Sequence, residues 1–140
     1  MFCINMQAQT IDSLEHEWTY FTSDKSYGNE KNIAYKLLRI APLNTEAISY
    51  LAEVFGRNNQ ADSVNFLFDS LMTVYPDSTK IYILLANESI ASYGKLTYTQ
   101  RINYLKKAQT IDSNDLYIPY SIGRIYYDLF IREYNKWNRK

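Results

Sequence analysis

The 140-residue sequence has one cysteine, Cys3, and one histidine, His16. A single cysteine cannot form an internal disulfide, and a structural zinc site normally draws four ligands from cysteine and histidine. His16 lies between two glutamates in "LEHEW", where a solvated helix residue is the simpler interpretation than a general base. The sequence therefore predicts no metal site, and it shows no nucleophile paired with a base.

Glycine and proline are also scarce, with four glycines and three prolines in the chain. The glycines are scattered along the sequence, so none of them forms a phosphate-binding loop. A β-sandwich or β-barrel of this length would need more turn residues, so the composition favours an all-helical fold. No apolar run approaches the roughly 18 residues that span a bilayer.

An excess of charge of either sign is absent, because 15 Lys and Arg residues balance 15 Asp and Glu residues. This balance argues against a dominant surface for nucleic acid or for an anionic membrane. Hydrophobic residues make up 46% of the sequence, which is typical of a folded domain and not of a disordered chain.

The first ten residues, "MFCINMQAQT", resemble the end of the apolar core and the cleavage region of an export signal from a bacterial protein. The alternative is a frayed N-terminus or the tail of a preceding helix. If residues 1–10 are a signal remnant, the protein is periplasmic or secreted, and otherwise it is cytoplasmic. Whether Met1 is the true start stays open, as does whether the chain is a piece of a longer protein.

Three junctions along the chain resemble one another, each with an apolar run, a Pro or Ser, short polar residues and a new apolar run. They read "LLRIAPLNTEA", "LMTVYPDSTKI" and "KKAQTIDSNDL". The equivalent points, Pro42, Pro76 and Ser113, are 34 and 37 residues apart. A period near 34 residues is the length of a repeat built from two helices.

The apolar residues within each period recur at helical spacing. Ile48, Leu51, Ala52 and Phe55 share one helix face, and a second face follows "GRNNQ", in which Gly56 suits a left-handed C-cap. The next period has a longer turn, "SYGK", and "SYGNE" upstream is expected to be a matching turn. We therefore expect helix pairs at about 11–41, 44–75 and 78–112, followed by a final helix at 115–138.

At three places the sequence resembles the tetratricopeptide repeat family. "YSIGRIYYDL" carries the family's Leu-Gly-x-x-Tyr-Tyr core with Ile122 in place of Leu, and "LAEVF" is the same core with Ala52 in place of Gly. "YLKKAQTIDSND" matches the ending of the family's second helix, with Ser113 in place of Pro. The resemblance covers residues 42–130 well and 11–41 poorly.

The resemblance implies a right-handed α-solenoid of about three stacked helix pairs plus a terminal helix. In such repeats the paired helices cross closely, and Ala52, Ala86 and Gly123 would lie at these contacts. The large residues nearby would then fill the core, and they are Phe55, Phe68, Tyr104 and Tyr126.

The resemblance also implies a concave groove lined by the first helix of each pair. The inward-facing positions carried over from the family are Ser49, Glu53, Arg57, Lys80, Ile83, Asn87, Tyr117, Tyr120, Arg124 and Tyr127. Tyrosine and arginine are the residue types that anchor protein interfaces. Because tyrosine is abundant throughout the chain, structural packing of these rings is the alternative interpretation.

These observations predict a non-enzymatic module that binds a partner protein, as an extended peptide or a helix, without a cofactor. A second hypothesis is that the repeats belong to a larger exported or envelope protein, in which they regulate or recruit another domain. A third is RNA binding by a related helical repeat, which the balanced charge disfavours. The oligomeric state is not predicted.

Overall fold

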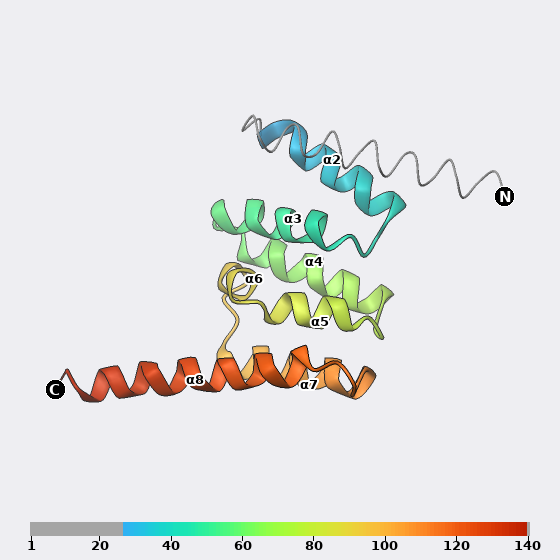
Figure 1. Ribbon diagram of the computed structural model, residues 1–140. Helices are drawn as coiled ribbons and strands as arrows, with labels where there is room; N and C mark the ends of the chain where they lie inside the picture. Colours follow the sequence, from blue (N-terminus) through green and yellow to red (C-terminus); the bar gives the residue numbers. More distant parts are fainter. Residues whose placement is uncertain (1–26, 140) are drawn as a thin grey trace. The chain divides into compact units, whose positions relative to one another are not determined.

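The computed structural model describes residues 27–139, and this part of the chain is all-helical, as the composition predicted. It contains seven helices (Figure 1): α2 (Tyr27–Ile40), α3 (Thr45–Arg57), α4 (Ala61–Val74), α5 (Thr79–Ala86), α6 (Glu88–Tyr93), α7 (Tyr98–Ile111) and α8 (Tyr117–Trp137). The chain divides into two compact units, residues 1–54 and residues 55–140. None of the described helices is long and apolar enough to cross a membrane.

The first unit contains α2 and most of α3. Ile33, Ala34 and Leu37 of α2 are buried, and their spacing places them on one face of the helix. α2 begins at Tyr27, so the turn expected at "SYGNE" is wrong, and Gly28 lies in the first helical turn. The expected helix upstream of this point, the signal remnant, Cys3 and His16 lie outside the described residues.

Polar side chains fix where α3 and α7 begin. The Asn44 side-chain oxygen accepts a hydrogen bond from the backbone N–H of Ala47 at 2.9 Å. Thr97 and Gln100 form a capping box at the start of α7, in which each side chain bonds the other residue's backbone N–H. Such contacts satisfy N–H groups that have no partner within the helix itself.

The first helix of the 78–112 period is interrupted after Ala86, a break that the apolar spacing did not predict. Asn87 adopts an extended backbone with ψ near 139° and caps the short helix α6 by accepting a hydrogen bond from the Ser89 N–H at 3.1 Å. The interruption leaves the Ala86 carbonyl outside the helical hydrogen-bond pattern. Arg101 on α7 satisfies it, because its Nε donates to this oxygen at 2.9 Å.

In the second unit α7 packs against both α5 and α8 (Figure 1). The core here is formed by residues from these three helices: Tyr82, Ala86, Ile102, Leu105, Ala108, Ile118 and Ile125. The burial of Ala86 agrees with its expected place at a close helix contact. Phe68 is also buried as expected, whereas Phe55 and Tyr104 are half-buried.

The Tyr93 side chain lies close to Gly56. The left-handed C-cap predicted at Gly56 is wrong, because its φ is not positive. Gly56 lies within α3, and within residues 27–139 a positive φ occurs at Asn59 and Lys95, both at 57°. A Cβ atom at Gly56 would lie 2.2 Å from ring atoms of Tyr93 on α6. Glycine is thus required at this position because an aromatic side chain occupies the space of any larger residue.

Gly123, in contrast, is not at a helix crossing, which corrects the expectation from the resemblance. It is exposed, and a Cβ atom built on it would meet no atom within 4 Å. Tyr126 is likewise not a core residue, because 53% of it is exposed. The inner face of α8 is formed instead by Ile118 and Ile125, with Ile122 and Leu129 partly buried beside them.

Candidate binding pocket

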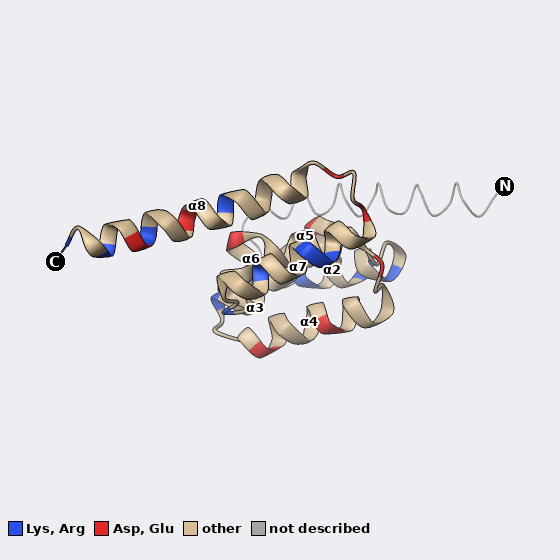
Figure 2. Cartoon of the chain, turned by 90° about the horizontal axis from the view of Figure 1, so that it is seen from below, with Lys and Arg blue, Asp and Glu red and all other residues tan. Residues whose placement is uncertain are grey.

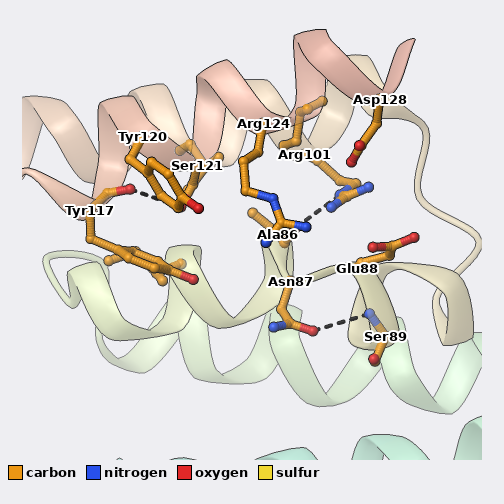
Figure 3. Close-up of a pocket in the computed structure, with 13 residues that line it drawn as sticks. Ala86, Asn87, Glu88, Ser89, Arg101, Tyr117, Tyr120, Ser121, Arg124 and Asp128 are labelled. Carbon is orange, nitrogen blue, oxygen red and sulfur yellow. Dashed lines mark hydrogen bonds between the residues drawn. The ribbon is translucent and has the colours of Figure 1, made fainter. Parts of the chain in front are cut away.

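A pocket of about 280 Å³ lies in the second unit between α8 on one side and the junction of α5 and α6 on the other (Figure 3). α8 contributes Tyr117, Tyr120, Ser121, Arg124, Ile125 and Asp128 to the lining. The junction contributes Ile83, Ala86, Asn87, Glu88 and Ser89, and α7 contributes Arg101 and Leu105 at the base. The break after Ala86 therefore shapes this pocket directly.

Five of the ten predicted groove residues line this pocket: Ile83, Asn87, Tyr117, Tyr120 and Arg124. Lys80 and Tyr127 are exposed on α5 and α8 but are not part of the lining. Ser49 and Glu53 lie on α3 in the first unit, and Arg57 is exposed at the end of α3; none of the three lines the pocket.

The aromatic end of the pocket is formed by two tyrosines at the start of α8. The rings of Tyr117 and Tyr120 lie with their centroids 6.4 Å apart. The side chains are 54% and 61% exposed, so both rings offer apolar surface to solvent. Two hydrogen bonds hold the backbone at Tyr117. Ser121 Oγ donates to the Tyr117 carbonyl at 2.8 Å, and the Asp115 side chain accepts from the Tyr117 N–H at 2.9 Å.

Two guanidinium groups form the middle of the pocket (Figure 3). Arg101 is the one buried charged residue among those that the structure describes, and its guanidinium also lies 5.6 Å from the centre of the Tyr98 ring. With Nε bonded to Ala86, its two terminal amino groups make no hydrogen bond within the described part of the chain. Arg124 is exposed and forms no ion pair there either.

The far end of the pocket is acidic, with Asp128 on α8 and Glu88 at the start of α6. Along α8 the lining therefore runs from Tyr117 and Tyr120, through Arg124, to Asp128 (Figure 3). At 1.5 Å of rise per residue these positions extend over about 16 Å. This is the length of about five residues of extended peptide at roughly 3.3 Å per residue.

The sequence interpretation missed Arg101, Glu88 and Asp128. Arg101 has a detectable signal, because Arg101, Leu105 and Ala108 share one helix face, which places a charge on the apolar stripe of α7. A buried arginine requires hydrogen-bond partners. Its partner is the Ala86 carbonyl, which is available because the helix breaks after Ala86, and no pattern in the sequence predicts that break.

The pocket lining combines aromatic rings, guanidinium groups and carboxylates. Among the residues that the structure describes, no three His, Cys, Asp or Glu side chains are grouped so that they could hold a metal ion. Aromatic faces can bury apolar groups, and guanidinium groups can pair with carboxylates.

No protein-family model matches the chain, and no curated protein matches it significantly.

Proposed function

We propose that the protein is a non-enzymatic interaction module that binds a short extended segment of a partner protein in the pocket between α8 and the α5–α6 junction. The observation that carries this proposal is the gathering of Tyr117, Tyr120 and Arg124 from α8 opposite Asn87 at the α5–α6 junction. Tyrosine and arginine are the residues that most often dominate binding energy at protein interfaces.

The order of chemistry along the pocket suggests the order of groups in the bound segment. An apolar side chain would lie against the two tyrosines, and an acidic side chain would pair with Arg101 and Arg124. A basic side chain would then meet Asp128 and Glu88. Because Arg101 is buried and held by the Ala86 carbonyl, its guanidinium is oriented before binding, which lowers the entropic cost of pairing.

The exposure of Tyr117 and Tyr120 favours this proposal over the alternative that the tyrosines serve packing. Rings that stabilise a fold are normally covered, whereas these rings remain accessible on the pocket wall. The mixed charge of the pocket also disfavours RNA, since Glu88 and Asp128 would repel a phosphate backbone.

The packed helices α5, α7 and α8 also support a tetratricopeptide-like arrangement, in which successive helix pairs stack as an α-solenoid. On this proposal α5 and α8 are equivalent first helices of successive repeats, and the pocket is part of the concave groove. The break at Asn87 is then a local departure that frees the Ala86 carbonyl for Arg101.

The test is binding of a library of pentapeptides blocked at both ends, measured by fluorescence polarisation and then by calorimetry. We expect the selected peptides to have an apolar, an acidic and a basic residue in this order. Tyr117→Ala/Arg124→Ala should weaken binding by about 2–4 kcal/mol. Lys80→Ala/Tyr127→Ala is the matched control, because it removes two predicted groove residues that do not line the pocket. Equal loss in the two double variants would refute the pocket assignment.

A further inference from the structure

α8 has a second apolar face that no other helix of the second unit covers. It consists of residues three or four positions apart, and we call it the aromatic face: Leu116, Pro119, Gly123, Tyr126, Phe130, Tyr134 and Trp137. Every one of these residues is exposed, from 51% for Tyr134 to 82% for Leu116 among the large side chains. The aromatic face is distinct from the inner face of Ile118 and Ile125 and from the pocket wall of Tyr117, Arg124 and Asp128.

The spacing on this face is that of a helix that packs along another helix. Positions that alternate between three and four residues average close to the 3.5-residue period of a coiled-coil contact. The inner face of α8 has the same spacing at Ile118, Ile122, Ile125 and Leu129, and there α7 is the neighbour. Figure 2 shows that the C-terminal part of α8 extends past α6 and α7. The Phe130 and Tyr134 rings stack on each other with their centroids 6.1 Å apart, and both residues remain more than half exposed.

We infer that the aromatic face is a dimer interface, on which α8 of a second copy packs antiparallel. Aligning the two faces for full overlap places a two-fold axis at Tyr126. Leu116 then lies opposite Trp137 of the second copy, and Gly123 lies opposite Phe130. The open space over Gly123 accepts the Phe130 ring, which gives the exposed glycine a role.

Charge supports the antiparallel direction over the parallel one. Asp112 and Asp115 precede α8, whereas Arg132, Lys136 and Arg139 lie near its end and outnumber Glu133, which is paired with Lys136 at 2.6 Å (Figure 2). In the antiparallel pair these acidic and basic ends meet twice, once at each end of the interface. The antiparallel direction also places the positive end of each helix dipole beside the negative end of the other.

The apolar area is sufficient for a specific dimer. An aromatic side chain buries about 150–250 Å² when it is fully covered. Tyr126, Phe130, Tyr134 and Trp137 are half to three-quarters exposed, which leaves roughly 500 Å² of ring surface to bury on each copy. Leu116 and Pro119 bring this total toward the roughly 800 Å² per partner of a standard interface.

The first test is the oligomeric state of the full chain, measured by analytical ultracentrifugation over a concentration series. We expect a dimer whose dissociation constant rises by at least about tenfold in Phe130→Lys, because the charge would be buried opposite Gly123. Phe66→Lys is the control, since Phe66 is an equally exposed ring on α4 and its loss should leave the dimer unchanged. A monomer at every concentration would overturn the proposal, as would a dimer that Phe130→Lys leaves intact.

The second test fixes the alignment by disulfide cross-linking in a Cys3→Ser background. Tyr126→Cys should link to itself under oxidation, because the two copies of this position meet on the two-fold axis. Leu116→Cys should not link to itself, since its two copies lie about 30 Å apart at 1.5 Å per residue. Circular dichroism checks that each variant is folded. Efficient linkage through Leu116→Cys would show a parallel pair and would overturn the antiparallel arrangement.

Discussion

Gly56 and Gly123 lie in two regions of the second unit that use the smallest residue in different ways. At Gly56 the Tyr93 ring fills the space in which a Cβ atom would stand. At Gly123 the same space is empty, and the residues around it on α8 are exposed aromatic side chains. The first glycine permits contact within the fold, whereas the second leaves a gap on a surface.

This difference shows that an apolar stripe on a helix is not sufficient evidence that the stripe is buried in the core. α8 has two stripes with nearly the same spacing, and only the stripe of Ile118 and Ile125 is buried. The aliphatic residues are on the buried side and the aromatic residues are on the exposed side. Tyrosine can remain at a solvated surface because its hydroxyl group stays hydrated while its ring is available for contact.

We expect the largest difference in folding stability when one residue on each face of α8 is replaced by alanine. Ile118→Ala should destabilise the protein by about 2–5 kcal/mol, because the side chain is fully buried and its removal leaves a cavity. Phe130→Ala should change the stability by less than about 0.5 kcal/mol at concentrations where the chain is monomeric. Urea denaturation followed by circular dichroism measures both changes in stability. Similar losses of stability would mean that the aromatic face is also buried in the monomer.

A smaller and opposite pair of effects is expected at the glycines. Gly56→Ala should cost about 1–3 kcal/mol because the new methyl group overlaps the Tyr93 ring. Gly123→Ala should stabilise monomeric protein by up to about 1 kcal/mol, since alanine is the better helix former and nothing obstructs it.

The double variant Gly56→Ala/Tyr93→Ala separates the overlap from other effects of the substitution at Gly56. Adding Gly56→Ala to a Tyr93→Ala background should cost little, because the obstructing ring is gone. A full penalty in that background would show that crowding by Tyr93 is not the reason for the glycine. Thermal denaturation of the four proteins completes this cycle.

The smallest effect concerns the pH dependence of stability in the packed region. Burial raises the pKa of the Tyr104 hydroxyl above its ordinary value of 10.0, and the nearby Asp69 and Tyr82 raise it further. A tyrosine whose pKa is higher in the folded state stabilises the protein below pH 10 and loses that contribution as the pH rises toward the folded-state pKa.

Tyr104→Phe should therefore reduce the fall in stability above about pH 10 relative to wild type. Urea denaturation at a series of alkaline pH values measures this difference, and the comparison between the two proteins removes the contribution of other titrating groups. Identical slopes for the two proteins would contradict a raised pKa at Tyr104.

The helices themselves were predictable to a large extent. The positions of Pro42 and Pro76 and the spacing of Ile48, Leu51 and Ala52 place α3 and α4 within the expected 44–75 range. α8 also falls within the expected 115–138 range, which followed from the repeat pattern. Helix formation depends on backbone sterics and side-chain spacing among residues that are close in sequence, so helices can be predicted from a single sequence.

The sites were less predictable, because they depend on residues that are distant along the chain. Tyr117, Tyr120 and Arg124 were predicted through the resemblance and line the pocket. Arg101 reaches the pocket because it bonds the Ala86 carbonyl, a contact that the sequence did not predict. The interruption of the helix at Asn87 carries no proline or glycine that would mark it. Gly123 was assigned to the wrong environment, since a helical stripe does not state which neighbour, if any, covers it.

Composition and the spacing of apolar residues were thus sufficient to predict an all-helical fold with short connections. Both features of the fold follow from local conformational preferences. The packing of α7 between α5 and α8 decided which arginine is buried and which tyrosines remain exposed. The approach of Tyr93 on α6 decided which glycine is crowded. Those outcomes depend on contacts between segments far apart in sequence, and only the relative placement of the helices determines which side chains meet.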